Sequence, residues 1–342
     1  MVCSRIAQAC SWASPDIEVI IRDNSGDLHK REFLGHLRRD HCNIVLAEPC
    51  DGLVNFSEIL RMARGEFIFM LADDDLCFER AIAALPDVLG GIEDPSVAGV
   101  TAAYVVETAQ GSSLVSYQNL ESHDVVERVV GYLRFGGPNI LHYAPIRRDI
   151  VQRVFALMND LPCYFSFHDQ ITCLLYVLNG KFARLQRLLY LYDMGDWETA
   201  DSAQKKDVAF YAAAGLDPAI NRLHWLLCGF EGAALAMHAD VFPNYPAAQR
   251  QAIADRWFGT MFLRFKSVPR QTFDSPFAAE AEKLFEKVQG SVGQLSFEGV
   301  LAEISGFIAL LSKTRGQSYF DFWGAMIHKS KPALRRPARE TG

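Results

Sequence analysis

The segment Gly65-Glu66-Phe67-Ile68-Phe69-Met70-Leu71-Ala72-Asp73-Asp74-Asp75-Leu76 is an apolar run that leads without a break into three consecutive carboxylates. Such a run is typical of a strand covered on both faces, as in a parallel sheet. Side chains at the carboxyl end of such a strand open into the ligand crevice. Carboxylate oxygens there suit Mg2+ or Mn2+, which take further oxygens from substrate phosphates. The segment therefore predicts a metal–diphosphate site, although an isolated acidic triplet is more often a solvated loop.

Length and charge narrow the class of protein. A chain of 342 residues is long enough for one large α/β domain and a smaller helical addition. Its formal charge of −7 gives no reason to expect nucleic acid, whose binders usually have a basic surface. No run approaches the roughly 18 apolar residues of a membrane span. Residues 1–10 lack the apolar core of a secretory signal. We therefore expect a cytoplasmic enzyme that does not bind nucleic acid.

The eight cysteines show neither Cys-x-x-Cys pairs nor a regular spacing. Metal sites and disulfide frameworks have such spacings, whereas cytoplasmic thiols stay reduced. We expect reduced, mostly buried thiols.

Strand and helix signals alternate in the first half of the chain, and helix signals dominate the second. Alternation of strands and helices indicates a mostly parallel sheet. From about residue 200 the apolar positions recur at helical spacing, most clearly over 297–311. The expected strands cover 17–21, 43–46, 65–71 and 97–106, and the expected helices of this half cover 53–63 and 79–89.

Several short motifs follow one another in the first 195 residues. They are Pro15-Asp16-Ile17-Glu18-Val19-Ile20-Ile21-Arg22-Asp23-Asn24-Ser25, Asn55-Phe56 leading to Ala63-Arg64-Gly65-Glu66-Phe67-Ile68, Asp73-Asp74-Asp75, Arg147-Arg148 within 143–154, and Phe167-His168-Asp169-Gln170 before Gly180-Lys181-Phe182. Their order and spacing resemble the nucleotide-sugar domain of family 2 inverting glycosyltransferases of the GT-A fold. The resemblance covers residues 5–195.

The resemblance implies a fold and a domain division. The expected fold is α/β, a mostly parallel GT-A (Rossmann-like) sheet flanked by helices, with a C-terminal α-helical region. Residues 1–199 would form the nucleotide-sugar-binding and catalytic domain. Residues 200–328 would form a helical acceptor-side or accessory domain, and 329–342 a basic tail.

The resemblance also implies a nucleotide site. Asp23 matches the carboxylate that accepts a hydrogen bond from the uracil ring, and a short acceptor at a strand end suits that role. From the residues alone, an Asp that caps a turn explains Asp23 equally well. Asn24, Asn55 and Asp73 complete the expected nucleotide-binding set.

The same resemblance assigns the metal, Mn2+ or Mg2+, to Asp74 and Asp75. Asp74 matches the residue that most directly holds the ion bridging the diphosphate, while Asp73 and Asp75 orient it or the ribose. A bound ion would neutralise charge on the departing nucleoside diphosphate. Many relatives carry a further acid where this chain has Ala72, so the choice among the three Asp ligands stays open.

Asp169 matches the general base of the family. Inverting glycosyl transfer is a direct displacement in which the acceptor hydroxyl loses its proton, so one positioned carboxylate suffices. The apolar segment 171–178 that follows is expected to hold Asp169 rigidly. His168 stands where relatives have a second acid; it either tunes the base, meets the acceptor or is a surface residue at a helix start. Asp193 or Asp196 would take the place of a His ligand in the loop of relatives.

The front of the chain departs from the family. Relatives begin with a strand and a turn that touches the nucleotide, whereas residues 1–13 accommodate only the following helix. The first strand, normally internal to the sheet, is therefore expected to be absent. A late start codon, rearranged neighbouring strands and a degenerate member of the family all explain this pattern.

Two functional classes follow. The first is a metal-dependent inverting glycosyltransferase that moves a sugar from a nucleotide-sugar, a UDP-sugar above all, to a hydroxyl of a glycan or lipid-linked acceptor. The second is a catalytically inert relative that acts as a binding or scaffold protein in polysaccharide assembly. A nucleotidyltransferase ranks third, because the start has no Gly-rich phosphate loop.

The C-terminal segment raises the question of membrane contact. Aromatic and apolar residues between 319 and 327 precede basic residues between 329 and 339. Aromatic rings favour the headgroup boundary, and basic residues are attracted to anionic lipid. Peripheral contact with the inner membrane face is one expectation. The alternative is that the aromatic side chains pack on the protein.

Overall fold

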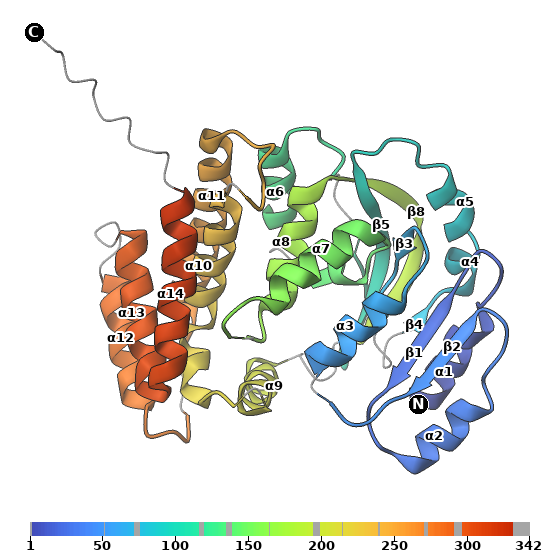
Figure 1. Ribbon diagram of the computed structural model, residues 1–342, viewed down its shortest axis with the longest axis horizontal. Coiled ribbons are helices and arrows are strands. Elements are labelled where there is room, and N and C mark those ends of the chain that lie inside the picture. Colours follow the sequence, from blue (N-terminus) through green and yellow to red (C-terminus); the bar gives the residue numbers. More distant parts are fainter. Residues whose placement is uncertain are drawn as a thin grey trace, which may run out of the picture. The chain divides into compact units, whose positions relative to one another are not determined.

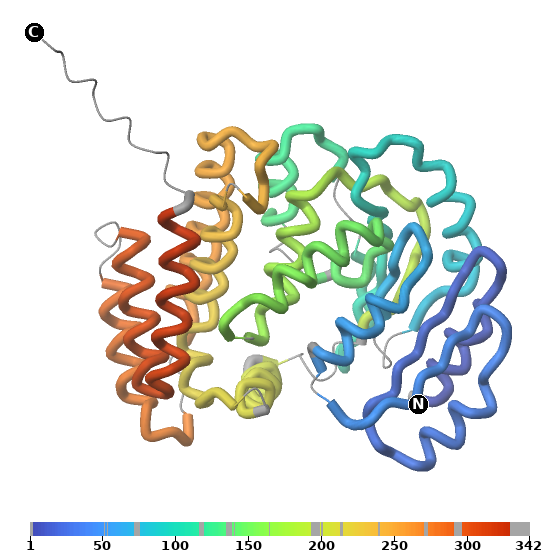
Figure 2. The backbone as a smooth tube through the Cα atoms, in the orientation of Figure 1, coloured from blue at the N-terminus to red at the C-terminus, as the bar shows by residue number. Residues whose placement is uncertain are grey.

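The computed structural model describes most of the chain and divides into two compact units. Unit 1 comprises Met1–Asp160 and Thr172–Ala203, and unit 2 comprises Leu161–Ile171 and Gln204–Gly342. The sequence did not predict that 161–171 belongs with the helical unit. Figures 1 and 2 trace the chain. The described residues are 2–50, 52–71, 76–115, 120–134, 139–163, 165–193, 199–213, 215–238, 240–269, 273–290 and 296–330.

Unit 1 has an α/β fold, which confirms the expected class. Its strands are β1 (Val19–Asp23), β2 (Cys42–Leu46), β3 (Phe67–Ile68), β4 (Leu76–Cys77), β5 (Val97–Thr108), β6 (Gly111–Val115), β7 (Ile146–Arg147) and β8 (Lys181–Asp193). Its helices are α1 (Val2–Ser11), α2 (Leu28–Gly35), α3 (Gly52–Met62), α4 (Glu79–Ile82), α5 (Leu85–Gly90), α6 (Val125–Arg134), the 3-10 helix Asn139–Tyr143, and α7 (Arg148–Asn159). Helix α8 (His168–Asn179) begins in unit 2 and continues into unit 1, and α9 (Ala200–Ala213) runs from unit 1 into unit 2.

The strands form two sheets. Strands β1 and β2 pair in parallel as a two-stranded sheet, and a six-stranded sheet has the order β3-β7-β5-β8-β4, with β6 paired to β5. In the larger sheet β5 and β8 are parallel, while the β3–β7, β7–β5, β4–β8 and β5–β6 pairs are antiparallel. The pairing is thus mixed rather than mostly parallel. One reason is local: only two residues join β5 to β6, and so short a connection allows only an antiparallel pair.

The strand before the acidic triplet is shorter than the apolar run suggested. Only Phe67 and Ile68 form β3, although the run continues to Leu71. The expected helix over 79–89 is split into α4 and α5, because Pro86 lacks the N–H that an uninterrupted helix requires.

Two arginines hold the first strands of the larger sheet together. Arg147 forms an ion pair with Glu66 (Nη1–Oε1 2.6 Å) and donates from Nε to the Val97 carbonyl. Arg148 donates to the Arg64 carbonyl at 2.6 Å. The motif Arg147-Arg148 therefore has a structural role within unit 1.

Unit 2 is helical, as expected for the C-terminal region. All eight cysteines of the chain are free, and six are buried, as expected for mostly buried thiols. No helix in the described part of the chain is long and apolar enough to cross a membrane. Beyond the shared helices, the elements of unit 2 are a 3-10 helix (Pro218–Leu223), α10 (His224–Met237), α11 (Ala247–Ser267), α12 (Ala278–Gly290), α13 (Phe297–Leu311) and α14 (Lys313–Ser330).

Helix α14 carries the aromatic cluster that suggested membrane contact. Tyr319 and Trp323 are fully buried and Ile327 is 5% exposed, so these side chains belong to the core of unit 2. Phe320 is 43% exposed. The basic residues from 331 onward lie outside the described residues. Peripheral membrane contact therefore stays a prediction, and Tyr319, Trp323 and Ile327 no longer support it because they are buried.

Gly99→Ala tests the contact of β5 with β7. A Cβ at Gly99 would lie 2.4 Å from the Pro145 carbonyl oxygen and 3.1 Å from the Phe182 ring, so backbone must move. We expect a loss of about 1–3 kcal/mol in unfolding free energy, measured by urea titration. Gly90→Ala is the control, because no described atom beyond its chain neighbours and its own helix backbone lies within 4 Å of the added Cβ. Equal stability of the two variants would contradict the tight approach.

Candidate functional site

Asp23 is a buried carboxylate at the carboxyl end of β1. Its side chain is almost inaccessible, with 3% of the residue exposed. Oδ1 accepts a hydrogen bond from the Ser25 hydroxyl (2.9 Å) and lies 3.2 Å from Lys30 Nζ. Oδ2 is also buried but has no hydrogen-bond partner among the described residues; Arg31 Nε lies 4.0 Å from it. A buried oxygen without a partner is costly, so its accepting capacity points to a ligand donor.

The Asp23 end of β1 opens into a cavity of about 730 Å³ within unit 1. Asp23, Asn24 and Lys30 line its polar end, and the rest of the cavity runs along β1 and β3. Lys30 and Arg31 come from the first turn of α2, which Asp27 caps by accepting from the N–H groups of His29 and Lys30. These two cations offset the charge of Asp23 and favour an anionic group nearby.

The other predicted nucleotide residues are occupied by contacts within the protein. Asn24 donates from Nδ2 to the Cys50 carbonyl at 2.9 Å. Asn55, on α3, accepts from the Arg22 guanidinium and donates to the Arg22 carbonyl (3.4 Å). Both residues line the same cavity as Asp23. Their side chains hold the end of β1 against its neighbours, and their role toward a nucleotide stays a prediction.

The predicted metal residues lie outside the described part of the chain. This holds for Asp74 and Asp75, for Asp73 and for Asp196, while the side chain of Asp193 is likewise not described. Among the described residues, no group of three or more His, Cys, Asp or Glu side chains is placed to hold a metal ion. Fit to Mn2+ or Mg2+ therefore rests on the oxygen chemistry of the triplet alone.

Asp169 lies in the first turn of α8, in unit 2, and is half-buried. Its Oδ1 accepts from the Gln170 N–H at 2.7 Å, which fixes the carboxylate at the helix start. The helix dipole favours a negative charge there. From Ile171 to Leu178 the helix is fully buried, so the expected rigid support is present.

His168 is a core residue, which corrects the interpretation of a surface histidine and of one that meets the acceptor. It is 1% exposed. Its Nδ1 accepts from the Phe165 N–H (3.4 Å), so the neutral ring carries its proton on Nε2, which donates to Glu231 Oε2 at 3.0 Å. The Tyr319 hydroxyl donates to Glu231 Oε1 at 2.8 Å. This buried chain fixes the first turn of α8, and with it Asp169.

A second polar cluster lies near Asp169 in unit 2. The Ser166 hydroxyl donates to the Tyr211 hydroxyl (3.0 Å), and His224 Nδ1 lies 3.1 Å from that hydroxyl. Burial raises the pKa of Asp207 to about 6; a hydrogen bond with Ser166 lowers it and the charge of Asp169 raises it. Burial lowers the pKa of His224 to about 3, so this imidazole is neutral. Asp169 and Asp207 are therefore two carboxyl groups that repel each other when both are ionised.

Asp207→Asn should change the pH dependence of stability. The folded-state pKa of Asp207 lies above its unfolded value of 3.8. The contribution of its protonated carboxyl group to folding stability is therefore complete below pH 3.8 and is lost as the pH rises through about 6. At pH 7 the free energy of unfolding of the variant should therefore be higher than that of wild type by about 1 kcal/mol after solvent screening. Urea titration would show this as a higher midpoint concentration. Below pH 4 the two proteins should match. Asp274→Asn, at an exposed position, is the control; an equal gain there would refute the effect.

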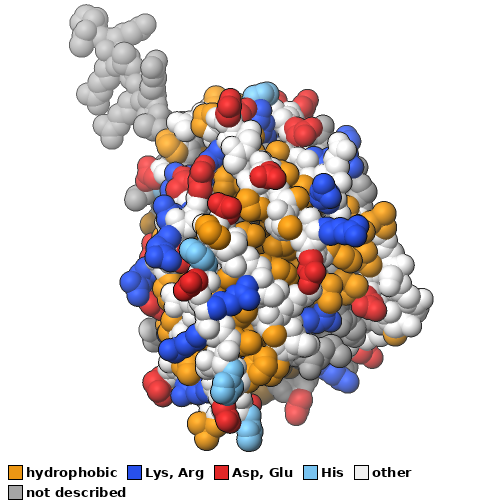
Figure 3. Space-filling model, turned by 90° about the vertical axis from the view of Figure 1, so that its right-hand side faces the viewer, with side chains coloured by type: hydrophobic (Ala, Val, Ile, Leu, Met, Phe, Trp, Pro, Cys, Tyr) orange, Lys and Arg blue, Asp and Glu red, His pale blue; other side chains and the backbone are white. Residues whose placement is uncertain are grey.

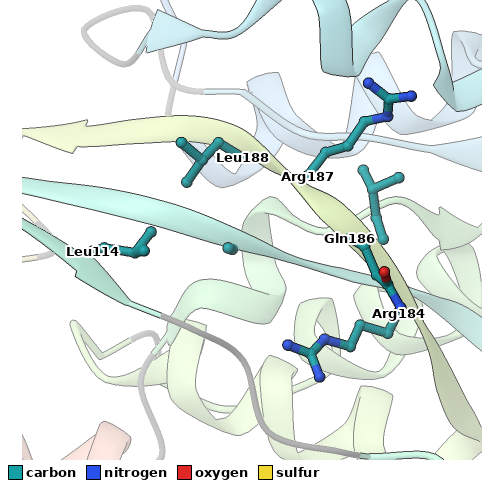
Figure 4. A pocket seen from close by; sticks show the side chains of 7 residues that line it. Leu114, Arg184, Gln186, Arg187 and Leu188 are labelled. Atoms are coloured by element: carbon teal, nitrogen blue, oxygen red, sulfur yellow. The ribbon is translucent and has the colours of Figure 1, made fainter.

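A second pocket of unit 1, of about 450 Å³, lies along β8 and contains no predicted site residue. Figure 4 shows that the Arg184 and Arg187 side chains extend in opposite directions from β8, with Leu188 and Leu114 to one side. Its polar groups do not converge, so it lacks a feature typical of ligand sites.

Sequence reasoning missed Glu231, Tyr319 and Asp207. Glu231 carried a usable signal, because it is the one acidic residue in the otherwise apolar helix α10. A lone charge in such a helix requires a buried partner. Asp207 had no comparable signal, since polar residues surround it in α9.

The comparison with solved structures found proteins of similar fold, whereas two other comparisons found no match. No family model matches the chain, and no curated protein matches it significantly. The crystal structure of S. aureus TarS 1–349 matches with a TM-score of 0.50 and 12% identity, over 96% of this chain and 85% of that one. TarS 1–349 in complex with UDP-GlcNAc matches with a TM-score of 0.50 and 13% identity, over the same shares. At this identity the likeness concerns the fold alone: the chain has a glycosyltransferase fold.

Proposed function

We propose that this protein is a metal-dependent inverting glycosyltransferase. It transfers a sugar from a nucleotide-sugar, a UDP-sugar, to a hydroxyl of a glycan or lipid-linked acceptor. It acts in the cytoplasm, with a peripheral membrane contact when the acceptor is lipid-linked. The observation that carries the proposal is the buried Asp23 carboxylate, whose Oδ2 lacks a hydrogen-bond partner among the described residues at the polar end of the unit 1 cavity.

The chemistry of Asp23 supports a uracil base. An ionised carboxylate only accepts hydrogen bonds, and uracil offers the N3–H as a donor. Cytosine has an acceptor at N3 and would face the carboxylate with a lone pair. Lys30 and Arg31 supply positive charge beside Asp23, which suits the phosphates of a nucleoside diphosphate. TarS, which has the same fold, has been solved with UDP-GlcNAc, and this supports a UDP-sugar as the donor class.

Asp169 is the proposed general base. As the acceptor oxygen attacks the anomeric carbon, its proton passes to the Asp169 carboxylate, and the sugar–phosphate bond breaks on the opposite face. The nucleoside diphosphate takes the bonding electron pair. Because Gln170 and the buried start of α8 fix Asp169, it loses little freedom in the reaction. His168, Glu231 and Tyr319 are positioning residues in this scheme.

The metal belongs to the proposal through the carboxylates of Asp73, Asp74 and Asp75. Mn2+ or Mg2+ bound there would neutralise charge on the diphosphate. Asp74 is the first candidate ligand, followed by Asp75. Calorimetry of UDP binding with MnCl2 or EDTA tests this part of the proposal. Equal affinity under both conditions, in wild type and Asp74→Ala alike, would remove the metal from the proposal.

The alternative is an inert relative that binds nucleotide-sugar or glycan as a scaffold. Among the described strands none pairs with β1 on the side away from β2, and this favours the alternative because it leaves the donor cavity incomplete. Retention of Asp23, Asp74 and Asp169 together favours the enzyme, because a structural fold does not require all three carboxylates. Release of UDP from UDP-GlcNAc, with water as the acceptor, separates the two classes.

Asp23→Asn should abolish the preference for uracil. We expect wild type to bind UDP more tightly than CDP, and the variant to bind UDP about 10-fold more weakly, because a hydrogen bond to a charged group is lost. Isothermal calorimetry with both nucleotides measures the effect. Glu32→Gln removes an exposed charge from the same region and should leave both affinities unchanged. A variant with wild-type UDP affinity would exclude Asp23 as the base-recognition residue.

Asp169→Asn should slow turnover without weakening donor binding. The amide keeps the shape of the side chain but accepts no proton, so UDP-GlcNAc hydrolysis should fall by about 10²–10⁴-fold. UDP affinity should stay within about twofold of wild type, which separates loss of the base from misfolding. Asp160→Asn, at an exposed position, is the matched control. Wild-type hydrolysis in Asp169→Asn would show that another group takes the proton.

A further inference from the structure

Cys10 and Cys42 form a pair of thiols in the core of unit 1. Cys10 lies on α1, and Cys42 is the first residue of β2, 32 residues further along the chain. The Cys42 thiol donates a hydrogen bond to Cys10 Sγ, and the two sulfur atoms are 3.2 Å apart. They need to approach by only roughly 1 Å to reach the length of a disulfide bond. The fold therefore brings together two thiols that their spacing in the sequence did not connect.

The surrounding core holds the two sulfur atoms in contact. Ile6, Leu34 and Ile44 pack with both cysteines in one buried cluster, which joins α1, α2 and β2. Just after α1, the Ala13 carbonyl accepts a hydrogen bond from the Arg39 guanidinium at 3.4 Å, so the turn before β2 is also tied to α1. These contacts leave the sulfur atoms little freedom to separate, which favours a bond between them.

Cys42 is the more accessible of the two thiols. It is 7% exposed, whereas Cys10 is 2% exposed. His41, the residue before it, has a φ of 61°, a left-handed conformation that is uncommon for residues other than glycine. Strain in this turn favours its local opening, and local opening gives a reagent access to Cys42.

Cys10 is suited to react second. Burial and the neighbouring Cys42 raise the pKa of the Cys10 thiol to about 12, whereas the charge of Arg39 lowers it. A protonated thiol is a weak nucleophile, so Cys10 does not start a reaction with an oxidant. Once Cys42 is oxidised to a neutral form, a thiolate charge on Cys42 no longer opposes ionisation of Cys10. The Cys10 sulfur is then already in contact with the atom that it attacks.

A small uncharged oxidant fits this site. Figure 3 views the molecule from the right-hand side of Figure 1, where α1, α2 and β2 lie, and basic and acidic side chains are interspersed on that face. Such a mixed surface gives a charged oxidant no electrostatic steering. Glutathione disulfide is also too bulky to reach a thiol as buried as Cys42. Hydrogen peroxide needs neither a wide opening nor steering by charge.

We propose that Cys10 and Cys42 are a redox-active dithiol that hydrogen peroxide converts into a disulfide between α1 and β2. The Cys42 sulfur attacks one peroxide oxygen, the O–O bond breaks and water leaves, so that Cys42 becomes a sulfenic acid. The Cys10 sulfur then attacks the Cys42 sulfur, the S–O bond breaks, and the hydroxyl group leaves with the Cys10 proton as a second water. The two thiols lose two electrons and two protons, and the peroxide takes up both.

The disulfide fixes one wall of the cavity of unit 1. Ile6 belongs both to the cluster around the pair and to the lining of that cavity. The bridged segment 10–42 contains all of β1 and α2, which carry Asp23 and Lys30. A bridge across this segment restrains the unfolded chain and so stabilises the fold. The inference rests on the contact between two thiols, and it does not depend on the proposed function.

Peptide mapping of the full chain tests the proposal. Trypsin and chymotrypsin release the peptides 6–12 and 40–46, each of which holds one cysteine. After treatment with hydrogen peroxide and alkylation of the remaining thiols, we expect these peptides to be linked, at a mass lower than their sum by two hydrogen atoms. Dithiothreitol should separate them. All proteins in the test carry Cys3→Ser, because Cys3 is exposed and would cross-link separate molecules.

Single variants assign the roles of the two thiols. Cys10→Ala leaves the Cys42 sulfenic acid without a resolving thiol, so its labelling by dimedone should rise by about tenfold or more. In Cys42→Ala, labelling of Cys10 should stay at background. Peroxide should raise the melting temperature of the parent protein by about 5–10 °C, and that of neither variant. Cys77→Ala removes a buried cysteine outside the pair, and this control should keep both the link and the shift.

Three results would overturn the proposal. If the peptides 6–12 and 40–46 stay unlinked while peroxide oxidises the partly exposed Cys50, the pair does not react in the folded chain. A link that forms only after urea has unfolded the protein would show that the fold does not present the two thiols to each other. Dimedone labelling of Cys10 in Cys42→Ala, without labelling of Cys42 in Cys10→Ala, would exclude the assigned order of reaction.

Discussion

Backbone pairing at the edge of β1 is the constraint on which unit 1 depends. An extended strand presents N–H and C=O groups alternately to its two sides, and both sides must find partners once helices cover the faces. Strand β2 satisfies one side through the parallel register from Val19 to Asp23. The other side faces the cavity shared with β3. The same geometry brings Asp23 to a buried strand end beside that cavity.

Unit 2 depends in a similar way on a buried acidic side chain. Glu231 lies in an apolar helix, and burial raises its pKa while the hydrogen bonds from His168 and Tyr319 oppose that shift. Removing a single partner from such a group leaves an uncompensated polar atom in the core. The start of α8 is therefore held by side chains from α10 and α14, and Asp169 inherits that rigidity. The C-terminal helices thus have a direct bearing on the proposed base.

Much of the fold was readable from local signals. Strand β5, helix α3 and helix α13 appear close to their expected bounds, because their periodicity or β-branched content is strong. Strand β3 proved shorter and the pairing proved mixed, because pairing partners come from distant residues such as Arg147 and Lys181. The burial of His168 was equally unreadable. Its acidic partner, Glu231, lies 63 residues away in the sequence, beyond the reach of any sequence window.

By itself the sequence determined the α/β class, the helical C-terminal region, the mostly buried cysteines and the choice of Asp23 and Asp169 as candidate acids. These depend on local composition, turn chemistry and motif order, which neighbouring residues specify. Only the tertiary structure decided that Asp23 Oδ2 is buried without a hydrogen-bond partner in the described chain, that His168 binds Glu231, and that Asp207 lies near enough to Asp169 to feel its charge. Burial and electrostatic interactions depend on distances in space, and residues far apart in the sequence set those distances.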